Sequence, residues 1–391
     1  MGKCLCQPND PSYLLETEYR AILNHNLIVI KKEEENRRLQ QEKTDQELPK
    51  AWKSGSLKYD ELKPLSEGGT AKLFLTEDLN LHRKVAYKTL HQDLRDSDIE
   101  TQRFVREARV TANIQHPGTV PVYELGRDRE GQLFFTMKRV LGLDLRQILL
   151  DLKHEVPEIV ERFPLPRLID ILIQVSQTIA YAHDAGVIHR DLKPANIIVG
   201  KFGEVYVLDW GLAKVMGGKS IAQDLGAEEK TPDLSLTRSG MHYGTPLYMT
   251  PEIARGLSDL DEKSDIFALG ILLFEMLALE PFLQGNDVTE IKQKLLDEPY
   301  PMPRELNPER KIAKDLQAIC MKALHRSRGH RYSSVTAFLE DLQKYRHGEE
   351  VSVYWYSGWE RFTRWNNQHA YLIISVVSGL IGAGIFALFA Q

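Results

Sequence analysis

The chain has 391 residues, of which 42% are hydrophobic and 27% are charged, and its formal net charge is −5. A length of this order suits one large domain with short additions. The slightly acidic balance, with a pI near 6.2, argues against nucleic acid as a partner, because phosphate backbones attract basic surfaces. Three cysteines occur, Cys4, Cys6 and Cys320, so we expect no disulfide framework, and a reducing compartment fits.

Residues 1–56 are polar and helix-prone, and we predict a separate leader there. Apolar side chains recur near helical spacing at Leu15, Tyr19, Ile22, Leu23 and Leu27. A charged run at 31–38 follows them. This pattern is typical of a surface helix or a flexible segment, and an interaction helix remains open as an alternative.

Residues 57–348 are predicted to form the main domain. A strand-rich part, with a helix at 99–114, precedes a part in which helical periodicity dominates. Further helices are expected at 168–183 and 266–279, and short strands at 187–188, 197–199 and 205–208. The predicted fold class is therefore α+β, with a small β-rich lobe, a larger helical lobe and a ligand-binding cleft between them.

Residues 370–391 contain no charged side chain. About 21 helical residues at ~1.5 Å rise would span ~31 Å, which matches a bilayer core of ~30 Å. We predict a transmembrane helix here, preceded by an aromatic and basic juxtamembrane segment at 349–369; a buried core helix is the alternative. The aromatic side chains expected at the membrane interface are Tyr354, Trp355, Tyr356, Trp359, Trp365 and Tyr371. The basic residues Lys344, Arg346, Arg361 and Arg364 precede the run, which by the positive-inside rule predicts a cytoplasmic main domain.

Four short motifs occur in one order along the main domain: V-A-Y-K at 85–88, H-R-D-L-K-P-A-N at 189–196, D-W-G at 209–211 and T-P-E at 250–252. Each alone is weak evidence, but their shared order is specific. From about residue 59 to 348 the chain resembles the eukaryotic-type (Hanks-type) protein serine/threonine kinases. It looks most like the bacterial members that end in a membrane helix, which implies a bacterial inner membrane as its location. The resemblance also implies a two-lobed protein kinase fold that uses ATP with Mg²⁺ (or Mn²⁺).

The resemblance assigns an ion pair to the phosphate site. Lys88 would contact the α and β phosphates of ATP, and Glu107, 19 positions later, would hold the lysine in place. A buried lysine needs such a partner, because an isolated buried charge is costly. A solvated helix face is the alternative interpretation of Glu107.

The resemblance places the chemistry in the 189–196 loop and the D-W-G triplet. Asp191 would accept the proton of the incoming hydroxyl, and Lys193 would neutralise the transferring phosphate. Asn196 and Asp209 would supply oxygen ligands for Mg²⁺. Lys193, with a proline after it, is similar to the serine/threonine subclass. His183 and His189 are interpreted as structural.

The phosphate-covering loop departs from the family pattern G-x-G-x-x-G. It aligns with residues 66–71, which keep only the second glycine, at Gly68, so the loop is expected to close over ATP with weaker binding. The nucleotide contacts implied by the resemblance come from Ser66, Gly68, Gly69, Leu73, Ala86, Lys88, Met137, Val140, Asp144 and Ile198. Of these, Met137 aligns with the gatekeeper, Val140 with the backbone partner of the base and Asp144 with a ribose contact. The apolar members are equally explained as core.

The segment from Asp209 to Glu252 is long, and its middle is rich in glycine, hydroxyl and charged residues. The resemblance makes it the activation segment. The arginine before Asp191 would bind a phosphate on it, and the candidate acceptors are Ser235, Thr237 and Ser239, with Thr237 preferred. Two structural pairings are also implied: Glu252 with Arg331, and Asp265 with the backbone of the 189–196 loop.

The predicted function is transfer of the ATP γ-phosphate to serine or threonine hydroxyls of proteins by a membrane-anchored kinase that phosphorylates itself. A pseudokinase that serves as a membrane-tethered scaffold is the alternative, favoured by the altered glycine loop. A small-molecule phosphotransferase is disfavoured by the Lys193–Pro194 pair. Small residues at Ser375, Gly379, Ala383 and Ala387 would allow helix pairing and a homodimer, although such residues are common in membrane helices.

Overall fold

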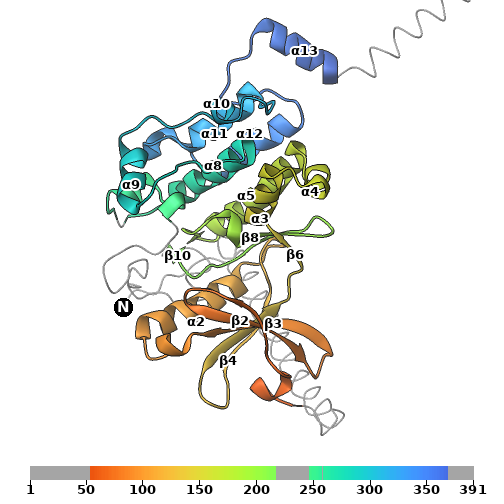
Figure 1. Cartoon of the computed structure of the whole chain (residues 1–391), viewed down its shortest axis with the longest axis vertical. Coiled ribbons are helices and arrows are strands. Elements are labelled where there is room, and N and C mark those ends of the chain that lie inside the picture. Colours follow the sequence, from red (N-terminus) through yellow and green to blue (C-terminus); the bar gives the residue numbers. More distant parts are fainter. Residues whose placement is uncertain (1–52, 217–245, 258, 369–391) are drawn as a thin grey trace, which may run out of the picture. The chain divides into compact units, whose positions relative to one another are not determined.

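The computed structural model describes residues 53–216, 246–257 and 259–368 (Figure 1). The predicted leader lies almost entirely outside these ranges, and the predicted membrane helix at 370–391 lies wholly outside them. None of the helices in the described ranges combines the length and hydropathy that a membrane crossing requires.

The chain divides into two units, and the described part of the first is small. It comprises residues 53–60 and 78–82 and contains a 3-10 helix at Gly55–Lys58. Asn80 ties its two segments together, because its side chain donates to the Lys53 carbonyl at 2.7 Å and accepts from the Lys53 amide at 3.2 Å.

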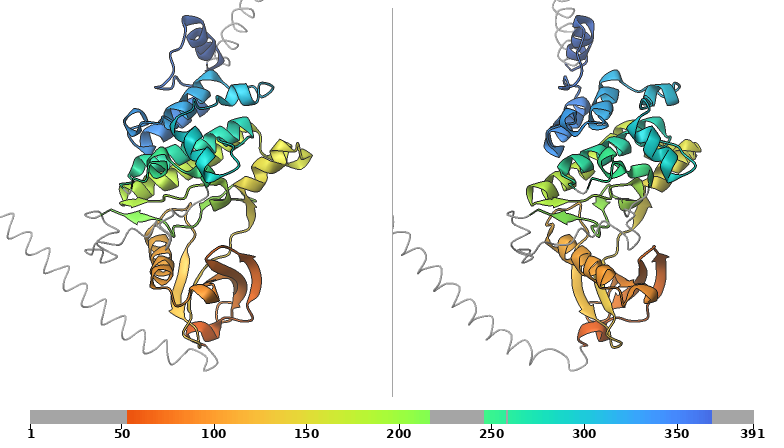
Figure 2. Two further views of the ribbon diagram at one scale, coloured as in Figure 1. Left: turned by 60° about the vertical axis from the view of Figure 1, so that its left-hand side comes forward. Right: turned by 90° about the vertical axis from the view of Figure 1, so that its left-hand side faces the viewer.

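The second unit begins with a five-stranded sheet in the order β1-β2-β3-β5-β4. The strands are β1 (Lys63–Glu67), β2 (Ala71–Asp78), β3 (Arg83–Leu90), β4 (Val122–Arg127) and β5 (Leu133–Lys138). Helix α2 (Asp98–Asn113) matches the helix predicted at 99–114 and begins at Ser97, whose side chain caps it. It packs on the sheet through Phe104 and Ala108, which meet Leu90 and Phe135 (Figure 2).

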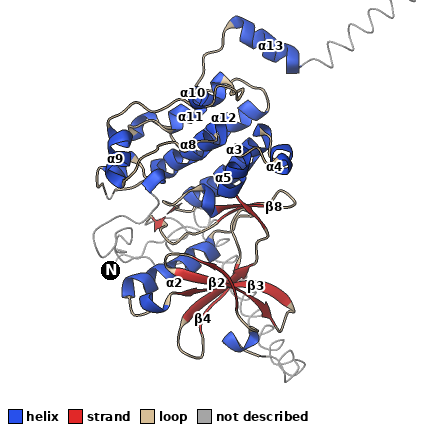
Figure 3. Ribbon diagram, viewed as in Figure 1, coloured by secondary structure: helices blue, strands red, loops and turns tan. Residues whose placement is uncertain are grey.

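The larger part of the second unit is helical (Figure 3). Its helices are α3 (Leu145–Lys153), α4 (Pro157–Arg162), α5 (Leu165–Asp184), α7 (Pro251–Ala254), α8 (Glu262–Ala278), α9 (Val288–Leu296), α10 (Pro303–Leu306), α11 (Lys314–Ala323), α12 (Val335–Arg346) and α13 (Gly358–Gln368). Helix α8 lies at the centre of the core, since every residue from Ser264 to Ala278 is buried. This explains the continuous apolar run in its sequence, because a helix covered on all sides needs no polar face.

Short strands carry the loops of the site. Strands β6 (Gly142–Asp144), β8 (Ile197–Gly200) and β9 (Val205–Val207) form one sheet, and β7 (Val187–Ile188) pairs with β10 (Lys214–Val215). The predicted strands at 187–188, 197–199 and 205–208 therefore agree with the structure to within a residue. The β-rich and helical parts together confirm the predicted two-lobed α+β kinase fold.

The aromatic segment after α12 differs from the sequence prediction at one position. Tyr356, which we assigned to a membrane-interface belt, is buried in the core of the helical lobe together with Val351. Its hydroxyl donates to Asp315 at 3.0 Å and accepts from the Val351 amide at 3.2 Å. The sequence does not indicate these buried polar partners, because Tyr356 is only one of several aromatic residues in this segment.

Candidate active site

A cavity of about 260 Å³ collects four of the polar residues that the sequence singled out, while Lys88 and Asn196 are not among its lining residues. Its walls come from the turn between β1 and β2, from α2, from the 189–196 loop and from the segment that begins at Asp209. Glu107, Asp191, Lys193 and Asp209 all line it. Four segments that are far apart in the sequence therefore place carboxylates and a lysine around one space.

Lys88 on β3 contacts Glu107 on α2 through a salt bridge in which both side chains are largely buried. Burial lowers the pKa of Lys88, but the carboxylates of Glu107 and Asp209 outweigh it and the pKa lies above its ordinary value. Burial raises the pKa of Glu107, and although the charge of Lys88 opposes that rise, the pKa stays above its ordinary value. The two nearby carboxylates keep Lys88 protonated.

Asp265 on α8 fixes the backbone at the start of the 189–196 loop. Its carboxylate accepts from the amides of His189 at 2.8 Å and Arg190 at 2.9 Å, and it bonds the ring of His183 at 2.7 Å. Arg190 has a φ of 68°, a left-handed conformation that costs about 1–3 kcal/mol in a non-glycine residue. The two bonds from Asp265 hold the chain in that conformation, which agrees with the predicted bracing role.

Asp191 lies at the centre of a small hydrogen-bond network. Lys193 donates to its Oδ2 at 2.6 Å, and the side-chain amide of Asn196 donates to its carbonyl at 2.8 Å and to Oδ2 at 3.2 Å. Both contacts come from residues on the same loop, so the loop positions its own carboxylate. The Lys193 ammonium places a positive charge next to the Asp191 carboxylate, where a phosphate could approach.

Asp209 also adopts a left-handed backbone, with a φ of 63°. Its side chain is exposed and lines the cavity. Burial raises the pKa of Asp209, but the charges of Lys88, His189 and Lys193 together hold it below its ordinary value. The carboxylate is therefore ionised and faces the cavity.

Gly211 and Trp210 set the local packing around Asp209. A Cβ at Gly211 would lie 3.2 Å from Asp209 Oδ1, so a side chain there would crowd the carboxylate. Trp210, which replaces the family's phenylalanine, is fully buried and packs on the ring of His189 at 4.6 Å between centroids. The larger indole is thus packed inside the fold next to the aspartate.

The donor set fits a hard divalent cation. Asn196 directs its amide nitrogen at Asp191, which leaves its carbonyl oxygen as a ligand, and Asp209 supplies a carboxylate. Among the described residues no three His, Cys, Asp or Glu side chains gather as a metal cage. Two protein oxygens suit Mg²⁺, which binds through few protein ligands and takes the rest from phosphates and water.

The predicted nucleotide contacts surround the same region, with different degrees of support. Ala86 on β3 is buried opposite Met137 on β5. Met137 packs against the buried cluster that α2 forms with the sheet. Val140 follows β5, Leu73 lies on β2 and Ile198 on β8, and all three are half-buried. Asp144 caps α3 by accepting from the Gln147 amide at 2.9 Å, a structural role that the sequence interpretation had not given it. The contacts with a nucleotide stay predictions.

The phosphate-covering loop is tied down by a residue that the sequence analysis missed. Ser66 and Gly68 are exposed, and Gly69 lines the cavity. The ring of His91, just after β3, bonds the Gly68 carbonyl at 2.7 Å, and its amide donates to Thr70 at 3.1 Å. In the sequence, His91 is marked only by its position three residues after Lys88, which indicates no particular role.

A second buried ion pair joins Glu252 and Arg331 in the helical lobe. Arg331 donates to both oxygens of Glu252, at 2.7 and 3.3 Å, with both side chains buried, which confirms the predicted pairing. Thr250 explains the departure from the family's alanine, because its hydroxyl caps α7 by accepting from the Ile253 amide. The phosphate-acceptor candidates Ser235, Thr237 and Ser239 lie outside the described residues.

Comparison with known proteins agrees with this geometry. The sequence matches the protein kinase domain over residues 59–342. It is 34% identical to the serine/threonine-protein kinase PknD of Chlamydia pneumoniae over 297 residues, which cover 74% of this chain and 31% of that protein. The proteins of the same name from Chlamydia trachomatis serovar D and Protochlamydia amoebophila are 35% and 33% identical, over 75% and 74% of this chain and 32% and 30% of theirs.

The chain thus spans about a third of the length of these curated relatives, and the shared part is the kinase domain. The family match covers more than half of the chain, and the order of the site residues agrees with it. The chain therefore belongs to the protein kinase domain family, in its bacterial, Hanks-type serine/threonine branch.

Proposed function

We propose that this protein transfers the γ-phosphate of ATP to serine or threonine hydroxyls of proteins. The observation that carries the proposal is the convergence of Glu107, Asp191, Lys193 and Asp209 on one cavity, with Lys88 held against Glu107. Phosphoryl transfer needs positioning and charge stabilisation more than covalent chemistry, and this set supplies both.

Each residue has a role that follows from its contacts. Lys88, kept protonated by two carboxylates, binds the α and β phosphates. Asp191 accepts the proton of the attacking hydroxyl and orients its oxygen, and Lys193 stabilises charge on the transferring phosphate. Asn196 and Asp209 hold Mg²⁺ (or Mn²⁺), which when bound offsets the negative charge of the phosphates.

The nucleotide is proposed to lie between the two lobes. Ser66, Gly68 and Gly69 cover its phosphates, and Leu73, Ala86, Met137, Val140 and Ile198 enclose the base, with Asp144 near the ribose. The bond from His91 to Gly68 supports a loop that is already ordered before ATP binds.

The anchoring and regulation of the enzyme belong to the same proposal. The charge-free run at 370–391 supports a single membrane helix with the kinase domain in the cytoplasm. Phosphate on Thr237, or on Ser235 or Ser239, would pair with Arg190 and order the activation segment. Helix pairing through the small residues of the run would bring two kinases together for phosphorylation in trans.

The alternative is a pseudokinase that binds nucleotide without turnover, and the single glycine kept from the G-x-G-x-x-G pattern favours it. Incubation of the full chain with labelled ATP, Mg²⁺ and a mixed protein substrate, followed by phosphoamino acid analysis, separates the two. We expect phosphoserine or phosphothreonine from the wild type and none from Asp209→Asn. ATP binding without any incorporation would favour the scaffold, and incorporation that persists in the variant would contradict the roles above.

A further inference from the structure

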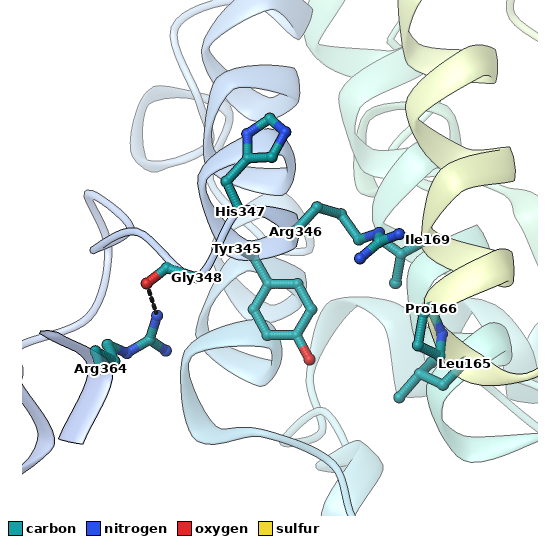
Figure 4. A pocket seen from close by; sticks show the side chains of 8 residues that line it. All are labelled: Leu165, Pro166, Ile169, Tyr345, Arg346, His347, Gly348 and Arg364. Atoms are coloured by element: carbon teal, nitrogen blue, oxygen red, sulfur yellow. Dashed lines mark hydrogen bonds between the residues drawn. The ribbon is translucent and has the colours of Figure 1, made fainter. Parts of the chain in front are cut away.

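Helix α13 is held against the helical lobe by its polar face. Arg364 contacts the buried carboxylate of Asp315 on α11 and donates to the carbonyls of Gly348 at 3.1 Å and Glu349 at 2.9 Å. The bond to Gly348 is visible in Figure 4, where Arg364 borders a cavity of about 570 Å³ formed with α5 and the end of α12. Four residues earlier, Glu360 accepts from the Ser357 amide at 2.8 Å and from the Tyr354 hydroxyl at 3.1 Å.

The segment that leads to α13 is itself bound to the lobe. Asp315 also accepts from the buried Tyr356 hydroxyl, and Asp341 accepts from the amide and the hydroxyl of Ser352, both at 2.7 Å. Charge-assisted bonds of this kind to buried carboxylates are among the stronger polar contacts in proteins. The orientation of α13 relative to the helical lobe is therefore fixed by at least two buried carboxylates.

The opposite face of α13 carries exposed aromatic rings. Trp359 is 72% exposed and Phe362 is 54% exposed, and the two rings lie 5.7 Å apart between centroids. Trp355, just before the helix, is 87% exposed. A helix on a water-facing surface normally buries its apolar face and exposes its polar face. Here the arrangement is reversed, and clustered exposed aromatic side chains mark an interaction surface.

We infer that this aromatic surface, formed by Trp359 and Phe362, lies in the headgroup layer of a lipid bilayer. Indole and phenyl rings are the side chains that favour that layer, because one side of it is apolar and the other is wet. Arg361, whose guanidinium lies 5.9 Å from the Trp355 ring, pairs with Glu350 at 3.0 Å, and both side chains are half-exposed. The charge-free run begins two residues after α13 ends.

This inference rests on the proposed membrane anchoring and goes beyond it. If the run crosses a bilayer, its first residues lie at the membrane surface, and α13 must lie beside them. The aromatic surface then faces the lipid while Glu360 and Arg364 face the lobe. The kinase domain would thus be held in one orientation at the membrane rather than suspended on a flexible linker.

A spin label at position 362 tests this placement in the full chain. Cys4 and Cys6 are replaced by serine, and Cys320 stays, because it is buried. Phe362→Cys and Phe202→Cys are then labelled separately and reconstituted in vesicles of phosphatidylethanolamine and phosphatidylglycerol. Phe202 is a matched control, since it is a phenylalanine that is 91% exposed on the turn between β8 and β9.

We expect the label at 362 to collide several-fold more often with oxygen than with an aqueous nickel complex, and the label at 202 to show the opposite preference. Depth analysis should place the former about 5–10 Å into the headgroup and acyl boundary. Equal aqueous access at both positions would overturn the inference. So would protection at 362 from both reagents, which means that protein, from this chain or from a second copy, covers the surface.

Extraction with alkaline carbonate, performed on the same vesicles, separates the two proposals. Protein that resists extraction but carries an aqueous label at 362 keeps its membrane anchor and loses only the placement of α13. Protein that is fully extracted has no bilayer-spanning run, so both the anchor and the placement of α13 fail, while the kinase activity is judged by its own assay.

Discussion

Lys88 on β3 and Glu107 on α2 are in direct contact across the small lobe, 19 residues apart in the sequence. This contact joins the sheet that carries the lysine to the helix that borders the cavity. Because Asp209 also acts on Lys88, the position of α2 determines how the lysine is presented to a triphosphate.

Replacement of Glu107 by glutamine should keep the shape of the side chain and remove its charge. We expect kcat/KM for ATP to fall roughly 10- to 100-fold, which corresponds to about 1.4–2.7 kcal/mol of transition-state stabilisation. The control is Asp98→Asn, an exposed acid on the first turn of the same helix. Equal losses in the two variants would show that the charge of α2, and not the contact with Lys88, is what matters.

Replacement of Arg331 by methionine should destabilise the helical lobe severely. The substitution removes the closest partner of the buried Glu252 carboxylate and leaves it with the more distant guanidinium of Arg328, at 4.0 Å. Loss of one member of a buried pair costs about 3–5 kcal/mol. The matched control is Lys294→Met, which breaks the half-buried pair between Lys294 and Glu290 on α9 and should cost far less, because solvent screens an ion pair at the surface. Urea unfolding of both variants measures the difference, and similar midpoints would contradict the assigned burial.

Glu275 on α8 should make stability depend on pH. Burial raises its pKa to about 7, while the bond from the Tyr248 hydroxyl at 3.0 Å opposes that rise. Between the unfolded pKa of 4.5 and the folded value near 7, the folded protein keeps a proton that the unfolded chain has released. The free energy of unfolding therefore falls as pH rises through this window, by at most about 3 kcal/mol, and levels off above it.

Glu275→Gln tests this dependence, because an amide mimics the protonated acid at every pH. Urea unfolding at about pH 5 and about pH 8 should show a smaller loss of stability in the variant than in the wild type. A wild type with no such slope, or an unchanged slope in the variant, would show that Glu275 titrates normally.

Truncation should show that the kinase domain extends beyond its predicted end at 348. A chain that ends at 348 leaves Asp315 without Tyr356 and Arg364, and Asp341 without Ser352. Asp315 keeps the bond from the Leu316 amide and Asp341 the bond from the Tyr332 hydroxyl, but the loss of the other partners of these buried carboxylates costs about 1–3 kcal/mol each. The shorter chain should therefore melt well below a chain that ends at 368. Equal melting temperatures would show that residues 349–368 do not stabilise the kinase domain and act as a linker.

Much of the fold could be predicted because local signals and the motif order agreed. The helix at 99–114 and the strands around the reactive loop appeared where their periodicity placed them, and Lys88, Glu107, Asp191 and Asp209 met as their order implied. The prediction failed where a contact depends on packing between distant segments. In the sequence Tyr356 cannot be told from its aromatic neighbours, and only the folded structure shows its bond to Asp315.

Two further features of the structure, one at the site and one on helix α13, have no local signal in the sequence. His91 holds the glycine loop only because β3 ends beside the turn between β1 and β2. The reversed polarity of α13 depends on which side of the helix finds Asp315, a residue more than forty positions earlier in the sequence. In both cases the tertiary fold, and not the pattern of nearby residues, assigns the role.

The most direct test of the account is single-turnover phosphate transfer by rapid quench, with wild type and Asp191→Asn compared at saturating ATP and Mg²⁺. The variant keeps the bonds that hold the loop and loses only the proton acceptor. We predict unchanged nucleotide affinity and a transfer rate lower by roughly 10²- to 10⁴-fold. A variant that transfers phosphate at the wild-type rate, or that loses nucleotide binding and transfer in parallel, would contradict the account.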